Sequence, residues 1–362
     1  MKNKCIAQIA IVLALASRTG AGPQQMSGSV SPPVLGFVPD GSSNLRPLIG
    51  VAGAAFVGPA VDLGFEFLQT AVASGQGYVL AIAGDAKRAV WLQVRGDGMA
   101  AHSLDMRECG EMDEMSGVVW ERKRTRCDRQ TIEGIDRIAL SSTGSAAALL
   151  QGSTGRIYIF TGLSQSPVFA RVIDTGGRDS VSVFAVTDDA QRVAFALSDG
   201  ERGSLFLSAG HELPRPIGSL PHPSSIQFLR GSEAAIVADD MEDRIYSLSN
   251  GQLYALATAE NGIAGPVALA VSTNNRRVFV ANGRSGSVTI LDVAGAAPVT
   301  VECHCSPKGL YPTSTDSVFR LTEFSGGPVV LFDASVEPSR MTFAPAGRLD
   351  FASLPNRLAG MK

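Results

Sequence analysis

The chain has 362 residues, of which 45% are hydrophobic and 18% are charged, so it can bury a substantial core. A formal net charge of −3 and a pI near 5.9 exclude an electrostatic basis for nucleic-acid binding, which needs a basic face. Only 4 histidines are present, which argues against His-rich metal chemistry, and 39 glycines with 19 prolines indicate many turns.

The N-terminus has the pattern of an export signal. Two lysines precede an apolar run at residues 6–15, which is too short to span a bilayer as a helix. We predict that residues 1–22 are a signal peptide that is cleaved near Ala16 or Ala21. The mature chain is then expected to be secreted or periplasmic, without a membrane span, and free to form disulfides.

Residues 265–303 set the pattern that the rest of the chain repeats. They contain four short β-rich runs separated by tight turns, which is typical of an antiparallel meander of four strands. Such a sheet alone leaves two edges without hydrogen-bond partners and an apolar face without cover. It therefore needs copies of itself to pack against.

The turn after the first run recurs along the chain at intervals of 41 to 45 residues, which is the length of one four-stranded propeller blade. The middle runs of each copy are hydrophobic on both faces, as expected for sheets packed between neighbouring blades. The copies of this turn lie at residues 143–144, 188–189, 231–232, 274–275 and 315–316.

We therefore predict an all-β fold, a seven-bladed β-propeller with four antiparallel strands per blade, with six and eight blades as alternatives. Residues 34–350 form this single domain, and residues 351–362 form a C-terminal tail. Ring closure is expected to pair residues 35–38 with the last sheet near residues 341–344, which would hide the edge strands. The blades are assigned to residues 34–65, 68–104, 137–175, 182–218, 224–258, 265–303 and 310–345.

Residues 105–130 break the period. Half of these residues are charged, mostly acidic at first and basic later, and Cys109 and Cys127 bracket the change. We predict an inserted hairpin that turns near residues 116–117 and is held by a Cys109–Cys127 disulfide, which would contribute more than its exposed ion pairs. A disordered charged loop is the alternative. A docking role for the hairpin is a further hypothesis.

One repeat resembles a known family. Residues 276–292 read RRVFVANGRSGSVTILD, which is similar to the YVTN-type repeat of the quinoprotein and WD40-like propellers, with FVAN at 279–282 and the turn SGSV at 285–288. The whole chain also looks like uncharacterised secreted bacterial propeller proteins, through residues 35–37 and 45–50. The resemblance implies a fold and an export route. Some members of the broader class are lactonases or carry redox cofactors, but their catalytic motifs have no counterpart here.

Short catalytic motifs are missing from the sequence. There is no G-x-S-x-G elbow, no H-E-x-x-H and no EF-hand loop. Residues 96–101 match G-x-G-x-x-A, but the helix that a dinucleotide site requires does not follow, so we interpret them as a hairpin turn.

The segment Cys303-His304-Cys305 has two interpretations. If it lies in a strand, the two cysteines face one way and His304 faces the other. Cys303 and Cys305 could then be thiolate ligands of Cu(I) or zinc. Alternatively they form a Cys303–Cys305 disulfide, which an oxidising compartment favours.

Charged and polar residues gather on the loops between the second and third strands and on the connections between blades. In a propeller these loops share one face, so we predict that this mixed-charge rim binds a sugar, a peptide or Ca²⁺ through oxygen ligands. A solvated turn surface is the alternative. The predicted rim residues are Arg178, Asp179, Asp199, His222, Asp239, Asp240, Glu260, Asn261, Arg284 and Lys308.

Clear repeats without a catalytic constellation predict a non-catalytic binding or scaffold module. Its partner would be an extracellular or periplasmic protein, peptide or glycan, and the chain is expected to act as a monomer. No cofactor is predicted, with Ca²⁺ as the open option. The alternative function is that of an enzyme, a lactonase-like or metal-dependent hydrolase with rim carboxylates around a divalent cation.

Overall fold

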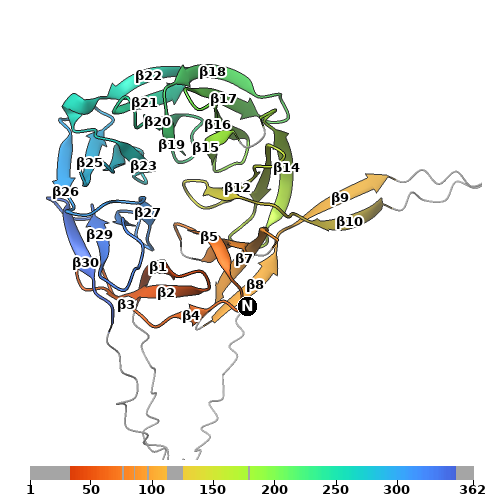
Figure 1. The fold of residues 1–362 in the computed structure, drawn as a ribbon, viewed down its shortest axis with the longest axis horizontal. Coiled ribbons are helices and arrows are strands. Elements are labelled where there is room, and N and C mark those ends of the chain that lie inside the picture. The colour runs from red at the N-terminus through yellow and green to blue at the C-terminus, as the bar shows by residue number, and fades with distance from the viewer. Residues whose placement is uncertain are drawn as a thin grey trace, which may run out of the picture. The chain divides into compact units, whose positions relative to one another are not determined.

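The computed structural model describes residues 33–75, 77–84, 86–95, 98–111, 125–177 and 180–347, with the backbone alone at residues 95, 98, 107–111 and 125–129. Seven four-stranded antiparallel sheets surround a central axis as the blades of a β-propeller (Figure 1). The predicted all-β fold and the predicted number of blades are confirmed. The predicted signal peptide and C-terminal tail lie outside the described residues.

Six blades are simple meanders, in which each strand pairs with the next and the first strand lies nearest to the centre of the ring (Figure 1). The second and third blades contain β5 (Phe67–Val72), β6 (Tyr78–Ala83), β7 (Arg88–Arg95), β8 (Gly98–Ser103), β11 (Arg137–Leu140), β12 (Ala146–Gln151), β13 (Arg156–Thr161) and β14 (Val168–Asp174). The fourth and fifth contain β15 (Val181–Val186), β16 (Arg192–Ser198), β17 (Gly203–Ala209), β18 (Arg215–Leu220), β19 (Pro223–Phe228), β20 (Ala235–Asp239), β21 (Arg244–Ser249) and β22 (Gln252–Ala257). The sixth and seventh contain β23 (Pro266–Val271), β24 (Arg277–Asn282), β25 (Ser287–Asp292), β26 (Val299–Glu302), β27 (Tyr311–Pro312), β28 (Val318–Arg320), β29 (Val329–Asp333) and β30 (Arg340–Ala344).

Hydrophobic clusters between the blades hold the ring together. Each of the seven clusters among the described residues joins two neighbouring blades. Phe195 of the fourth blade, for example, shares a cluster with Ile159 of the third. The middle strands supply both sides, because alternate side chains of a strand face opposite neighbours. β20 is buried throughout for this reason. The apolar core is therefore divided among the junctions between blades.

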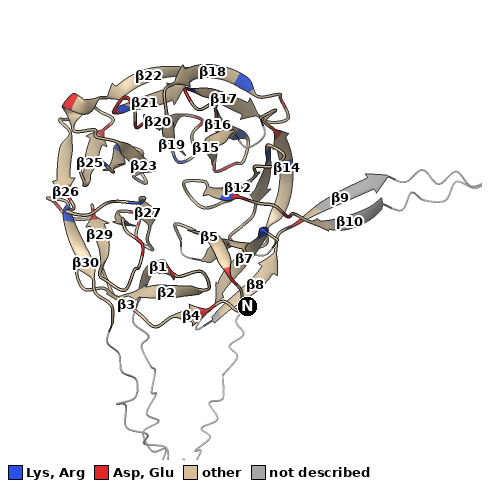
Figure 2. Cartoon of the chain, in the orientation of Figure 1, with Lys and Arg blue, Asp and Glu red and all other residues tan. Residues whose placement is uncertain are grey.

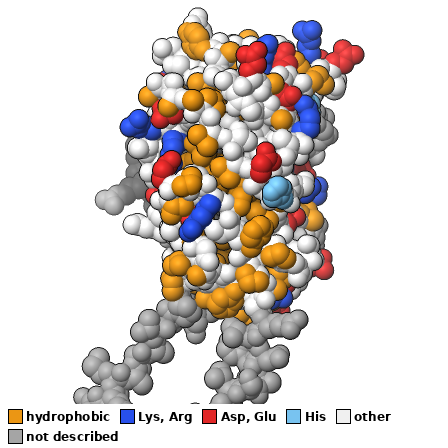
Figure 3. Space-filling model, turned by 90° about the vertical axis from the view of Figure 1, so that its left-hand side faces the viewer, with side chains coloured by type: hydrophobic (Ala, Val, Ile, Leu, Met, Phe, Trp, Pro, Cys, Tyr) orange, Lys and Arg blue, Asp and Glu red, His pale blue; other side chains and the backbone are white. Residues whose placement is uncertain are grey.

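The surface differs between the turns and the outer wall. Charged residues concentrate at loops and strand ends (Figure 2). On the side of β26 and β30, hydrophobic side chains are scattered among charged ones (Figure 3), and Val299 and Phe343 on these strands are exposed. Hydrophobic residues exposed singly in this way are ordinary for a protein surface.

The first blade is irregular and closes the ring differently from the prediction. β1 (Val34–Asp40) pairs with β2 (Asn44–Ile49), and both β3 (Phe56–Val57) and β4 (Val61–Asp62) pair with β2. Closure instead uses the segment after β30. The Val57 N–H donates to the Pro345 carbonyl at 2.8 Å, and the Gly347 N–H donates to the Val57 carbonyl at 2.9 Å.

The expected pairing of residues 35–38 with residues 341–344 is therefore wrong. β1 is the innermost strand of its blade and β30 is the outermost strand of the neighbouring blade, so the two strands lie at opposite edges. The two blades are joined instead by a hydrophobic cluster and by a hydrogen bond from the Ser314 N–H to the Leu35 carbonyl, at 2.6 Å.

The inserted segment forms a hairpin outside the seven blades. β9 (Asp105–Glu111) and β10 (Thr125–Thr131) are antiparallel and extend away from the ring (Figure 1). Their register places Cys109 directly opposite Cys127. The side chains of both cysteines and the expected turn at 116–117 lie outside the described residues, so the disulfide between them stays a prediction. No helix in the described residues is long and apolar enough to cross a membrane, and they contain a single 3-10 turn, η1 (Ala259–Asn261).

Candidate functional site

The turns of the blades form two faces of the ring. We call face A the side with the loops between first and second strands. We call face B the side with the loops between second and third strands and the connections between blades. Alternate turns of an antiparallel meander lie at opposite ends of its strands. The predicted rim residues that the structure describes all belong to face B.

The structure brings three predicted rim residues into contact on face B. The His222 Nδ1 atom lies 2.5 Å from Asp240 Oδ1. Arg284 donates from Nη2 to the Asp240 carbonyl at 3.1 Å and from Nη1 to Asp243 Oδ2 at 2.6 Å. The side chains of His222 and Arg284 are more than half exposed. This group therefore links the fifth and sixth blades through contacts that solvent screens.

Asp239 is next to this group but is used by the turn itself. Its Oδ1 accepts hydrogen bonds from the N–H groups of Met241 and Glu242, at 3.0 and 2.9 Å, and its Oδ2 accepts from the His222 N–H at 2.8 Å. The residue is 0% exposed. Both carboxylate oxygens thus satisfy backbone donors that would otherwise be buried without partners.

The other rim residues that the structure describes stay in separate loops. Asp199 accepts hydrogen bonds from the N–H groups of Arg202 and Glu201 of its own loop, and these bonds lower the pKa of its carboxyl group. Glu260 and Asn261 belong to η1.

The contacts of the last rim residues are equally local. Asn261 Oδ1 accepts the Thr258 N–H at 3.0 Å, and the Lys308 N–H donates to the Leu321 carbonyl at 2.8 Å. Arg178 and Asp179 lie outside the described residues. A role of the rim in binding stays a prediction.

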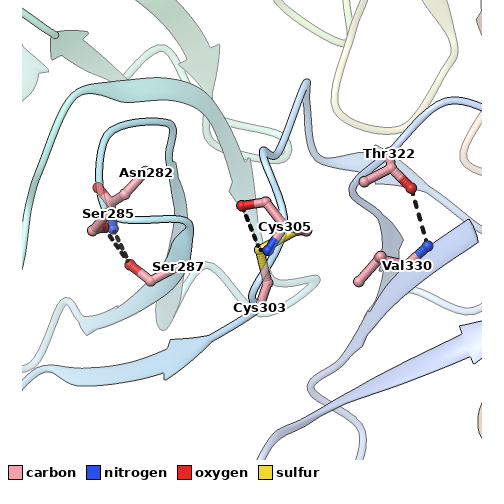
Figure 4. Close-up of a disulfide and its surroundings, with 7 residues drawn as sticks. All are labelled: Asn282, Ser285, Ser287, Cys303, Cys305, Thr322 and Val330. Carbon is pink, nitrogen blue, oxygen red and sulfur yellow. Dashed lines mark hydrogen bonds between the residues drawn. A yellow bond between two sulfur atoms is a disulfide. The ribbon is translucent and has the colours of Figure 1, made fainter.

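The Cys303–Cys305 disulfide is formed in the connection between the sixth and seventh blades (Figure 4). β26 ends at Glu302, so the cysteines are in a turn and not in the strand considered above, and His304 has φ of 50°. The Cys303 N–H donates to the Gly286 carbonyl at 2.9 Å. Both sulfurs are consumed by the bond, and a metal would need them as thiolates. Among the described residues, no three His, Cys, Asp or Glu side chains come together as metal ligands would.

Face A is organised differently, because hydrogen bonds at this end of the blades cross the channel and skip a blade. Gln227 of the fifth blade donates from Nε2 to Ser142 Oγ of the third at 2.7 Å, and Ser142 Oγ donates to the Phe228 carbonyl at 2.5 Å. Arg230 of the fifth blade donates from Nη2 to Asp316 Oδ1 of the seventh at 3.1 Å. We call these two links the crossbars.

Asp188 ties the loops of face A from the fourth blade, which lies between the ends of the first crossbar. Its Oδ1 accepts from the Thr143 N–H and hydroxyl, at 2.8 and 2.7 Å, and its Oδ2 accepts from the Gly231 N–H at 2.9 Å. Burial alone would raise the pKa of Asp188, but these hydrogen bonds outweigh it and lower the pKa. One carboxylate thereby joins three consecutive blades.

A cavity of about 240 Å³ lies in the channel beside these loops, and we call it the channel cavity. Six of the seven blades contribute to its wall, mainly through their first strands. None of the lining residues, all within the described part of the chain, is Asp, Glu, His, Cys or Lys. The lining residues are Phe37, Gln69, Thr70, Ala71, Val72, Ser74, Ile138, Leu140, Ser141, Ser142, Gln227, Arg230, Leu269, Ala270, Val271, Leu310, Tyr311, Pro312, Phe319 and Arg320.

Arg320 is the most buried charged group of this wall, at 4% exposed. Its guanidinium carbon lies 3.9 Å from the centre of the Tyr311 ring, and its Nη1 donates to the Thr322 carbonyl at 2.7 Å. Its Nε is buried without a hydrogen-bond partner. Burial lowers the pKa of Arg320 to about 10, so the group is still cationic at neutral pH. Burial also raises the pKa of Tyr311, which stays neutral.

The prediction from sequence missed this cavity. The sequence contains polar residues in first strands, such as Gln69 and Gln227, and Arg320 inside a hydrophobic run, which could have indicated the cavity. The Gln69 and Gln227 side chains can line the channel only because the strands that carry them are the innermost strands of their blades. That order follows from the folded ring and not from local pattern.

Comparisons with known proteins support the fold and nothing finer. No family model matches the chain, and no curated protein matches its sequence. A protein of unknown function from Desulfotomaculum acetoxidans aligns over 87% of this chain and 100% of its own, with a TM-score of 0.54 and 12% identity. A streptogramin B lyase aligns over 76% and 82% with a TM-score of 0.52 and 12% identity. Catalytically inactive virginiamycin B lyase from Staphylococcus aureus, solved with quinupristin, aligns over 77% and 84% with a TM-score of 0.50 and 12% identity.

Proposed function

We propose that this protein is a non-catalytic binding module that takes up a ligand, or one end of a larger ligand, in the channel cavity. The observation that supports the proposal is the residue composition of the cavity wall. The wall combines guanidinium, amide and hydroxyl groups with apolar side chains in one concave site, which is the composition expected of a ligand pocket. The links across face A hold these groups in place from several blades.

The chemistry of the wall favours binding over turnover. General acid–base and nucleophilic catalysis draw mainly on carboxylates, histidine, cysteine and lysine. The side chains that line the described cavity are instead Arg, Gln, Ser, Thr, Tyr and apolar residues, which orient a ligand through hydrogen bonds and contact. Among them the Tyr311 hydroxyl has its pKa raised by burial, which keeps it protonated at neutral pH, so little phenolate is present to act as a base.

The export signal predicted from the sequence and the resemblance of one repeat to the YVTN type support a location for this function. We propose that the mature chain acts outside the cytoplasm, on a small molecule or on a partner that carries a group small enough for the cavity. Face B then contributes contacts to the remainder of a peptide or glycan, and Ca²⁺ on that face remains part of this proposal.

One observation favours a second candidate, a hydrolase on face B. Asp240 lies close enough to the imidazole of His222 to orient it, which is the arrangement of a general base and its positioning partner. Asp239 adds little to a divalent-cation site, because backbone N–H groups occupy both of its oxygens. A panel of lactones and esters with wild type and His222→Ala tests this candidate. Hydrolysis that the substitution abolishes would replace the binding proposal with the enzyme.

The binding proposal is tested by filling the cavity. Thr70→Phe adds an aromatic ring to the wall, and Val299→Phe adds a similar ring to the exposed outer strand β26 as a matched control. Ligands are sought by thermal shift with a library of polar small molecules, since a ligand that binds only the folded state raises Tm. We expect hits that persist in Val299→Phe and disappear in Thr70→Phe. Hits that Thr70→Phe leaves unchanged would place binding elsewhere.

A further inference from the structure

Arg320 is an unusual cation for a protein interior, because no anion neutralises it. Within the described part of the chain it forms no ion pair, and it is 4% exposed. A buried charge costs several kcal/mol unless it is paired and hydrogen-bonded. Glu323 contributes a Coulombic attraction, but it is an exposed residue and makes no ion pair with Arg320.

The neighbours of Arg320 offset only part of this cost. The negative face of an aromatic ring attracts a cation, and Tyr311 provides that contact. Gly309 makes room for it, because a Cβ at this position would lie 2.6 Å from the Tyr311 Cζ atom. The Thr322 carbonyl takes one of the five N–H donors of the guanidinium group. The buried Nε is left facing no acceptor.

A second guanidinium in the same wall shares the unpartnered Nε but has an anion of its own. Arg230 uses Nη2 for the crossbar to Asp316, and its Nε is also buried without a hydrogen-bond partner. Two arginines from the fifth and seventh blades thus line one cavity with donors to spare. The planar guanidinium suits the paired oxygens of a carboxylate or phosphate. No described lining residue competes as an anion.

The rest of the wall limits the kind and size of the organic group to which the anion is attached. About half of the lining residues are apolar, among them Phe37, Leu140, Leu269 and Phe319. The volume of about 240 Å³ corresponds to roughly eight water molecules at the density of the liquid. An inorganic ion would leave the apolar part of this space without contacts, whereas a carboxylate on a short apolar body would fill it.

We infer that the channel cavity is a site for a small organic carboxylate, whose anionic group is held by Arg320 and Arg230 and whose apolar body packs against the first strands. This inference rests on the proposed function and adds the charge and size of its ligand. Hydrogen bonds from the guanidinium groups hold the anion, and the anion supplies the countercharge that Arg320 lacks.

Matched pairs of ligands test the charge without any mutation. Benzoate, phenylacetate and hexanoate are titrated calorimetrically into the full mature chain beside their neutral amides, benzamide, phenylacetamide and hexanamide, with inorganic phosphate as a further probe. We expect at least one carboxylate to bind about 10- to 100-fold more tightly than its amide, which is the range for hydrogen bonds to a charged group. Amides that bind equally well would overturn the inference and leave the proposed function standing.

Variants then test which arginine binds the carboxylate. Arg320→Met keeps an unbranched stem and removes the guanidinium group with its charge, and Arg230→Met is the second variant in case the first does not fold. Arg171→Met is the matched control. Arg171 is also buried, at 9% exposed with an unpartnered Nη1, but its bonds go to the Ala190 and Gln191 carbonyls and it does not line the cavity.

Carboxylate affinity should fall by about 10- to 100-fold in Arg320→Met and stay unchanged in Arg171→Met. Equal losses in both variants would contradict a local role for Arg320. Phosphate binding without carboxylate binding would also overturn the inference. If none of these probes binds and the library screen finds no ligand that Thr70→Phe excludes, the proposed function fails together with it.

Discussion

Face A and face B are built from turns of the same repeat, yet their side chains connect different partners. On face A, hydrogen bonds cross the channel from the third blade to the fifth and from the fifth to the seventh. On face B, the interactions of the charged residues stay within one loop or join neighbouring blades, as between Arg284 and Asp243. The face richer in predicted site residues is therefore the one whose charges serve local turns.

The difference shows that a charged residue on a propeller loop can be explained by the turn to which it belongs. A loop carboxylate such as Asp239 satisfies its own backbone, which is needed with or without a ligand. Arg320, inside a blade, has no such local use for its Nε. The informative residue is the polar group that the fold itself leaves without a partner.

The largest effect is expected from Asp188, which joins three blades on face A. Asp188→Ala removes acceptors from Thr143 and Gly231 at once, so we expect the free energy of unfolding to fall by about 1–3 kcal/mol. Urea unfolding at pH 7 measures the change. Asp199→Ala on face B is the control and should cost less, because its bonds lie within one loop. Equal losses would remove the contrast between the faces.

The contribution of Asp188 to the free energy of unfolding also depends on pH. Hydrogen bonding lowers the folded-state pKa of Asp188 below its unfolded value of about 3.9, so its contribution is complete above that value. As the pH falls through the folded pKa the carboxylate is protonated and the contribution is lost. The stability difference between wild type and Asp188→Asn should therefore be constant from pH 7 to pH 5 and shrink below pH 4. A difference that grows in acid would contradict the assigned role.

The first crossbar gives an intermediate effect. Ser142→Ala removes the hydroxyl that accepts from Gln227 and donates to the Phe228 carbonyl, so we expect a loss of about 0.5–1.5 kcal/mol. Hydrogen exchange reports where the loss occurs. Faster exchange of the face A loop that contains Arg230, with unchanged exchange on face B, would confirm that the link acts across the channel. Uniform acceleration would mean that it does not.

Most of the fold could be predicted from the sequence because each blade carries its own local pattern. The interval between turns and the doubly apolar middle strands correspond to the blades, and the charged insertion at residues 105–130 contains the β9–β10 hairpin outside the ring. Closure could not be predicted in the same way. The first blade has two-residue strands, β3 and β4, and the bond that closes the ring comes from Val57 and the segment after β30. Nothing periodic marks that segment.

The candidate site was harder to predict because it depends on contacts between residues that are far apart in the sequence. The Cys303–Cys305 disulfide was predicted from neighbouring residues and an oxidising compartment, and it is present. The crossbar between Ser142 and Gln227 joins residues 85 positions apart, and no local pattern indicates such a pair. Arg320 looks like an ordinary strand residue until the position of Tyr311 and the channel is known.

The smallest effect is expected on face B, from the ion pair between Arg284 and Asp243. Arg284→Met removes a pair in which the arginine side chain is 59% exposed, and exposed pairs contribute about 0.2–1 kcal/mol. The loss should diminish further in 0.5 M NaCl, because salt screens exposed charges within a few ångström. Urea unfolding at low and high salt measures both quantities. A loss of unfolding free energy above the range expected for Ser142→Ala, or one that salt does not reduce, would show that face B contributes as much to stability as face A. The contrast between the two faces would then have to be given up.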